Sequence, residues 1–359
     1  MSDIITIKAL VTIHVERAYA FDAERGVWLR RQEEADIIVP NLLTNTGRDQ
    51  LHVQGYDTTG LASNGFNYIG LSNDATSLYW NPAGTALLTQ NEFVASHTNW
   101  IADTKFDFGG LVLPLGGFGT IGVSLTSLTM ADMKVRTTDQ PEGTGEYFSA
   151  GDLAIGVSYS RRLTDRFTIG FTGKYINESI WHESANAFAL DAGTTFKTDL
   201  FGGMTIGASI MNFGTKMQMA GRDARQFISV NSTQQGSNNQ IPSDIELNSW
   251  DLPFLFQFGV ATNVVKMENY RWTVALDALH PSDNYESMNI GTELAYQDFF
   301  FLRTGYESLF LDQSEGGFSF GIGVASSTMM NTLGIKFDYA YRNMGRLEGV
   351  HTFSLGAQF

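Results

Sequence analysis

The feature that most constrains this sequence is a strict alternation of apolar and polar side chains along its final segment. From Phe353 to Phe359 every second residue is apolar, and the residues between them are small or polar. Successive side chains of a β-strand point to opposite faces of the sheet, so a period of two predicts a strand with one apolar face. The same period recurs upstream, for example over 153–160 and 333–342.

Extended to the whole chain, this alternation predicts fourteen strands. They lie near residues 92–102, 104–113, 118–130, 148–160, 166–177, 185–197, 202–213, 251–264, 270–279, 286–297, 299–310, 315–327, 333–343 and 348–359. A tilted strand needs roughly 9–11 residues to cross a bilayer, and bacterial barrels have an even number of strands. We therefore expect an all-β fold, a 14-stranded antiparallel transmembrane β-barrel with an N-terminal plug segment. A soluble β-sandwich or solenoid is the alternative.

The expected connections fall into a short and a long group. The two long connections, 131–147 and 214–250, lie at the same end of the expected barrel, and the short ones lie at the other: 114–117, 161–165, 198–201, 265–269 and 328–332. Outer-membrane barrels have short periplasmic turns and long extracellular loops. This segregation favours the barrel over the sandwich. The polar 214–250 loop is either a surface recognition loop or a flexible excursion.

Composition agrees with a barrel and excludes several other classes. The 359 residues include 37 Gly, 13% aromatic residues and no Cys, and the formal net charge is −15. An acidic balance argues against a nucleic-acid binder, and the lack of cysteine excludes disulfide scaffolds. Aromatic residues gather near the expected strand ends, as two interfacial girdles would require: Trp100, Tyr159, Trp181, Trp250, Tyr270, Trp272, Tyr285, Tyr296, Phe299 and Tyr341.

No motif in the sequence supports catalysis. Neither a Walker loop nor H-E-x-x-H is present, and the six histidines lack metal-ligand spacing. We therefore expect a protein that is not an enzyme and that uses no cofactor and no metal.

Charged residues within the expected strands fall on the inward face by parity. A charge on the lipid face would cost roughly 2–4 kcal/mol for Arg or Lys at the midplane. Two of these residues, Glu293 and Arg303, should face each other across a hairpin, close enough to pair. The inward charged residues are Lys174, Asp277, Glu293, Arg303, Lys336, Asp338 and Arg342. They either stabilise the lumen wall and hold an internal plug, or line a substrate path.

The first 72 residues do not follow the barrel pattern. Alternation over 5–15 predicts a strand, and 27–29 could return as its hairpin partner, so residues 1–72 form a small β-rich N-terminal extension. An exported barrel needs a signal peptide, and none is convincing here, because Asp3 stands where a basic cluster is expected and Lys8 interrupts the apolar run.

The run from Asn73 to Gly84, NDATSLYWNPAG, resembles the opening of the FadL-like outer-membrane barrels, and most of all their PorV/PorQ branch. With the strands that follow and the terminal Phe359, the resemblance covers residues 73–359. It implies a bacterial outer-membrane location and a segment 73–90 that folds as a plug or hatch inside a barrel formed by 91–359. The plug role then falls on Asn81, Pro82, Ala83 and Gly84.

The resemblance implies two functions. One is transport of hydrophobic small molecules, such as long-chain fatty acids, through a hatch-controlled lumen. The alternative is a PorV-like interaction component of type IX protein secretion. The expected partners are outer-membrane lipid together with a hydrophobic ligand or secretion-system proteins, and no nucleic acid. Residues 1–72 replace the usual start of these relatives and faintly resemble a phage structural protein, so a phage-related fusion is a further reading.

Overall fold

The computed structural model describes residues 73–228, 241–311, 317–326, 333–345 and 349–359, together with the backbone of three short N-terminal strands. Those three strands form a small antiparallel sheet: β1 (Tyr19–Asp22), β2 (Val27–Arg30) and β3 (Ile37–Ile38). The expected return strand at 27–29 corresponds to β2, whereas the strand expected over 5–15 lies outside the described residues.

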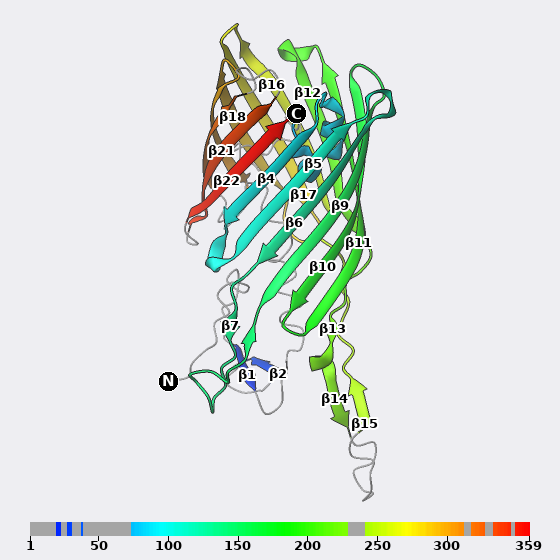
Figure 1. Ribbon diagram of the computed structural model, residues 1–359, viewed down its shortest axis with the longest axis vertical. Helices are drawn as coiled ribbons and strands as arrows, with labels where there is room; N and C mark the ends of the chain where they lie inside the picture. The colour runs from blue at the N-terminus through cyan, green and yellow to red at the C-terminus, as the bar shows by residue number, and fades with distance from the viewer. Residues whose placement is uncertain are drawn as a thin grey trace, which may run out of the picture.

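Fourteen strands form a closed antiparallel barrel, which confirms the expected fold class and strand count (Figure 1). Each strand pairs with the next in the chain, and the last strand pairs with the first over 92–99 and 351–358. In chain order the barrel strands are β4 (Glu92–Asn99), β5 (Lys105–Pro114), β6 (Thr120–Thr129), β9 (Ala150–Arg162), β10 (Phe167–Ile180), β11 (Glu183–Thr198), β12 (Met204–Gly214), β16 (Leu255–Lys266), β17 (Tyr270–Pro281), β18 (Ser287–Tyr296), β19 (Phe300–Leu309), β20 (Phe318–Ala325), β21 (Gly334–Asn343) and β22 (Gly349–Gln358).

Burial alternates along the strands as the sequence pattern does. In β20, Phe320 and Ile322 are exposed on the outside, whereas Ser319 and Gly321 are buried on the inside. Exposed apolar side chains on the outside form a lipid-facing band, and closure of the sheet gives the strand backbone its hydrogen-bond partners without water. None of the described helices is long and apolar enough to cross a membrane.

The two long connections leave the barrel at the same end (Figure 1). One links β6 to β9 and carries β7 (Met133–Lys134) and β8 (Tyr147–Phe148). The other links β12 to β16 and carries β13 (Ala220–Gly221), which pairs with β11, and a projecting hairpin of β14 (Arg225–Ile228) and β15 (Ile241–Asp244). Since extracellular loops are the long ones, we take this end as extracellular.

The segment before β4 forms a short α-helix, α2 (Ser77–Trp80), and a 3-10 helix, η2 (Pro82–Leu87). Every residue from Ala75 to Thr85 is buried, and η2 packs against β9, β10 and β11. The side chain of Asn81 caps η2, and Pro82 occupies its first turn, where a missing N–H costs nothing. This segment is called the plug below.

The assignment of Trp250 to the interfacial aromatic girdle is wrong. Trp250 is 5% exposed and belongs to the buried apolar cluster instead of the lipid-facing surface. Its backbone pairs with Met217, so the long connection between β12 and β16 turns Trp250 inward. Trp100 also packs, partly buried, against this cluster.

Candidate functional site: the plugged lumen

The NPAG run of the plug is hydrogen-bonded to the barrel wall. Asn81 Nδ2 donates to the carbonyl oxygen of Thr194 on β11 at 3.0 Å, while its Oδ1 accepts from the Ala83 N–H at 3.1 Å. Thr168 on β10 donates its hydroxyl to the Ala83 carbonyl at 3.1 Å. The Gly84 N–H donates to the Asn81 carbonyl at 2.9 Å. The four residues that the resemblance assigned to a hatch therefore lie inside the barrel, joined to two neighbouring strands.

The wall carries glycine where the plug touches it. A Cβ added at Gly170 would lie 2.4 Å from the carbonyl carbon of Pro82, and one added at Gly193 would lie 2.0 Å from Asn81 Oδ1. Any larger residue would collide with the plug, so these two glycines allow its close approach. The hydroxyls of Thr85 and Ser160, 2.6 Å apart, add a contact to β9.

One side of the lumen around the plug is apolar. The ring of Tyr79 packs edge-to-face against Trp80 at 4.7 Å and Phe108 at 5.7 Å between centroids. The buried cluster continues along the inner faces of β4 to β11 through residues such as Leu128 and Ile176. The plug therefore presents its aromatic side chains to an apolar wall.

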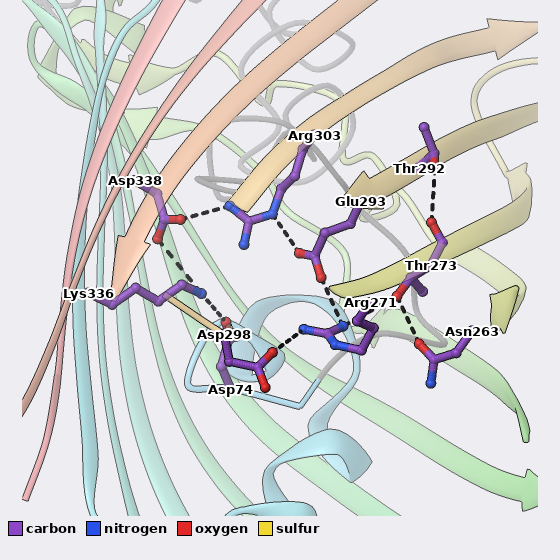
Figure 2. A network of polar contacts seen from close by, with 10 residues as sticks. All are labelled: Asp74, Asn263, Arg271, Thr273, Thr292, Glu293, Asp298, Arg303, Lys336 and Asp338. Atoms are coloured by element: carbon purple, nitrogen blue, oxygen red, sulfur yellow. Dashed lines mark hydrogen bonds and ion pairs between the residues drawn. The ribbon is translucent and has the colours of Figure 1, made fainter. Parts of the chain in front are cut away.

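The opposite part of the wall, from β17 to β21, is charged (Figure 2). Arg303 is 1% exposed and donates from Nε to Glu293 at 2.7 Å and from Nη1 to Asp338 at 2.8 Å. Glu293 also accepts from Arg271 at 3.0 Å. Glu293 and Arg303 lie directly opposite each other in the β18–β19 hairpin, where strand parity places them.

Asp74 joins this charged network to the plug. Its Oδ2 lies 3.1 Å from Lys336 Nζ, and its Oδ1 accepts from the N–H and the hydroxyl of Thr76. Burial alone would raise the pKa of Asp74, but the charge of Lys336 and the bonds from Thr76 outweigh burial and hold the pKa below its usual value. Reasoning from strand parity missed Asp74 because it lies outside the strands.

The remaining predicted residues lie elsewhere on the inner wall. Lys174 contacts Asp191 at 2.8 Å, Arg342 contacts Glu307 at 2.9 Å, and Asp277 is 3% exposed on the inner face of β17. The structure thus brings four of the seven charges into one network and leaves three apart: Lys174, Asp277 and Arg342.

Further inward carboxyl groups on β4, β9, β10, β11 and β19 escaped the sequence analysis: Glu92, Asp152, Glu178, Asp191 and Glu307. Parity alone could have found Asp152, since the alternation over 153–160 places the apolar Leu153 on one face and its neighbour Asp152 on the other. Among the residues that the structure describes, no group of three or more His, Cys, Asp or Glu is placed to hold a metal ion. The lumen offers ion pairs, hydrogen bonds and apolar contacts to a bound molecule.

Comparison with known proteins gives a family and a set of structures with the same fold. A family model described as "Type IX secretion system protein PorV" matches residues 55–257. The Pseudomonas putida toluene transporter TodX aligns with a TM-score of 0.52 at 12% identity, covering 85% of this chain and 97% of TodX. The CymD monoaromatic hydrocarbon channel aligns with a TM-score of 0.51 at 11% identity, covering 83% and 96%. No curated protein sequence matches.

Proposed function

The chain belongs to the PorV family of type IX secretion system proteins, and on that premise we propose that it acts as an outer-membrane docking component of protein secretion. The observation that carries this proposal is the anchoring of the plug. Hydrogen bonds to β10 and β11 and the ion pair of Asp74 with Lys336 hold the plug from two sides of the lumen. A barrel whose interior is held in this way suits a rigid platform for other proteins.

The extracellular hairpin of β14 and β15 supplies an area for such docking. It projects beyond the barrel (Figure 1), and Phe227 and Ile228 on β14 are exposed. Exposed apolar side chains on a projecting hairpin are typical of a protein-binding surface.

The test is recovery of partners from outer-membrane extracts of the source bacterium. Tagged full-length protein should retain secretion-system components, and a Phe227→Ser, Ile228→Ser variant should retain less. If the unaltered protein recovers no secretion-system component, the docking proposal is wrong. Variants that still show heat-modifiable gel mobility exclude misfolding as the cause.

A second candidate function is passage of hydrophobic small molecules such as long-chain fatty acids. The apolar inner wall from β4 to β11 and the fold shared with TodX favour it. Cells that lack the gene should regain uptake of labelled oleate when the protein is restored; unchanged uptake argues against transport. We propose that either role works by binding alone, without a catalytic step.

A further inference from the structure

The carboxyl groups of Asp152 and Glu178 form an isolated pair on the inner wall. The two residues lie directly opposite each other on β9 and β10, near the extracellular ends of both strands. Asp152 is 3% exposed and Glu178 is 5% exposed. Among the residues that the structure describes, neither carboxylate oxygen of Asp152 has a hydrogen-bond partner.

The inward neighbours of this pair are all apolar. Leu128 on β6 lies opposite Asp152, and Ala185 on β11 lies opposite Glu178. The next inward residues along β9 and β10 belong to the same apolar cluster or pack against it: Ala150, Ala154, Ile176 and Ile180. The carboxyl groups therefore sit in an apolar surface that supplies no positive charge.

Three other buried carboxylates of the same lumen each lie next to a cation. Asp191 lies 2.8 Å from Lys174, Asp338 lies 2.8 Å from Arg303, and Glu307 lies 2.9 Å from Arg342. Burying an unpaired carboxylate is costly, so proteins normally pair or neutralise it. A buried pair to which the described residues supply no counter-ion is a candidate site for a ligand that carries the missing charge.

A second unpartnered polar group lies in the same apolar cluster. Trp250 is 5% exposed, and its indole Nε1–H has no acceptor within the described part of the chain. The complement of the carboxyl pair is a molecule with a cationic donor group and an apolar body.

An organic cation fits this site better than a metal ion. Calcium takes six to eight oxygen ligands, and the inward neighbours of the pair are alanine, leucine and isoleucine. An ammonium group carries three N–H donors, enough to serve both carboxylates at once. The surrounding side chains would then contact the apolar body of the same molecule.

We propose that Asp152 and Glu178 bind a primary ammonium group carried on an apolar body that enters from the extracellular side. The group can belong to the side chain of a lysine in an apolar peptide segment or to a free amphiphilic amine. This site would give the proposed function a ligand class. It rests on the proposed function in one respect, that the outer part of the lumen admits a ligand.

The test uses the purified full-length protein in detergent and the fluorescent amine dansylcadaverine. We expect saturable binding with a rise in dansyl fluorescence, and weaker binding of N-butyl dansylamide, which has the same aromatic group without the ammonium. The variant Asp152→Asn, Glu178→Gln should weaken amine binding by about tenfold or more. Asp251→Asn removes an exposed carboxylate and should leave binding unchanged.

Competition separates the two sources of the ammonium group. Displacement by a lysine-containing apolar peptide, and not by its acetyl-lysine form, identifies a peptide ligand; displacement by decylamine alone identifies a free amine. Either result supports the site.

Three outcomes would overturn it: no saturable binding, equal affinity for the uncharged probe, or unchanged binding in the double variant. If the two carboxyl groups share a proton and bind no ligand, no saturable binding is expected. Heat-modifiable gel mobility of each variant verifies that the barrel is folded. Amine binding by a protein that recovers no secretion component would reject the docking proposal and leave this site standing.

Discussion

Asp74 and Lys336 are 262 positions apart in the sequence, and their side chains form an ion pair with a distance of 3.1 Å between Oδ2 and Nζ. Asp74 belongs to the plug and Lys336 to β21, so this pair connects the inserted segment to the charged wall (Figure 2). Lys336 also lies 3.7 Å from Asp338, which continues the network to Arg303. The plug and the wall of the barrel are thereby coupled electrostatically.

Replacing Lys336 by Met should loosen the plug while the barrel remains closed. A hydrogen bond to a charged group contributes about 1.5–3 kcal/mol, and this substitution also leaves Asp74 without its cation. Because the chain has no cysteine, Ser77→Cys provides a unique label in the plug, where Ser77 is fully buried. Maleimide labelling of this cysteine should be faster in the Lys336→Met background. Lys266→Met, at an exposed position, should leave the rate unchanged, and equal rates in both variants would contradict the coupling.

Gly170→Ala should also displace the plug, through sterics alone. Its new methyl group would lie 2.4–2.6 Å from backbone atoms of Pro82 and Ala83, and overpacking of this kind costs about 1–3 kcal/mol. Labelling of Ser77→Cys should increase accordingly. Gly173→Ala is the matched control on the same strand, since nothing lies within 4 Å of its added Cβ.

Arg303→Met should lower the stability of the barrel itself. It leaves Glu293 and Asp338 without their shared cation, and breaking a buried ion pair costs about 3–5 kcal/mol. The midpoint of thermal unfolding, followed by gel mobility, should decrease clearly. Arg166→Met breaks an exposed pair with Asp199 and should cost less than about 1 kcal/mol. A similar small effect of both substitutions would show that the network is dispensable.

The attachment of the plug should weaken in acid. The pKa of Asp74 is lowered in the folded protein, so its contribution to stability is complete above the usual carboxyl pKa of about 4 and is lost as the pH falls through the lower folded value. We therefore expect the difference in unfolding midpoint between the unaltered protein and Asp74→Asn to shrink as the pH falls below about 4. A difference that persists at pH 2 would argue against an ionised Asp74.

Strand parity was enough to find the barrel and part of its inner wall. Glu293 and Arg303 could be paired from the sequence because they are inward residues on consecutive strands of a hairpin. Contacts that leave the sheet could not be found in this way. Asp74 meets Lys336 only because the plug folds inside, and Trp250 turns inward only because its connection folds back against Met217. The role of a residue in a loop or plug depends on distant contacts that a local period does not encode.

The division of the chain into an extension of 1–72, a plug of 73–90 and a barrel of 91–359 stays a prediction. The family match begins at residue 55, upstream of Asn73. The absence of catalysis and the phage-related reading of the first residues likewise stay predictions.

Closure of the sheet between β4 and β22 has a consequence for biogenesis. Glu92 begins the first barrel strand, and its register partner is Gln358 in the final strand. Until that strand is synthesised and delivered, two rows of backbone groups have no neighbour, at a cost of several kcal/mol for each group left unsatisfied in hydrocarbon. Insertion of a closed barrel must therefore follow completion of the polypeptide, since a chain that lacks β22 has no strand to pair with β4.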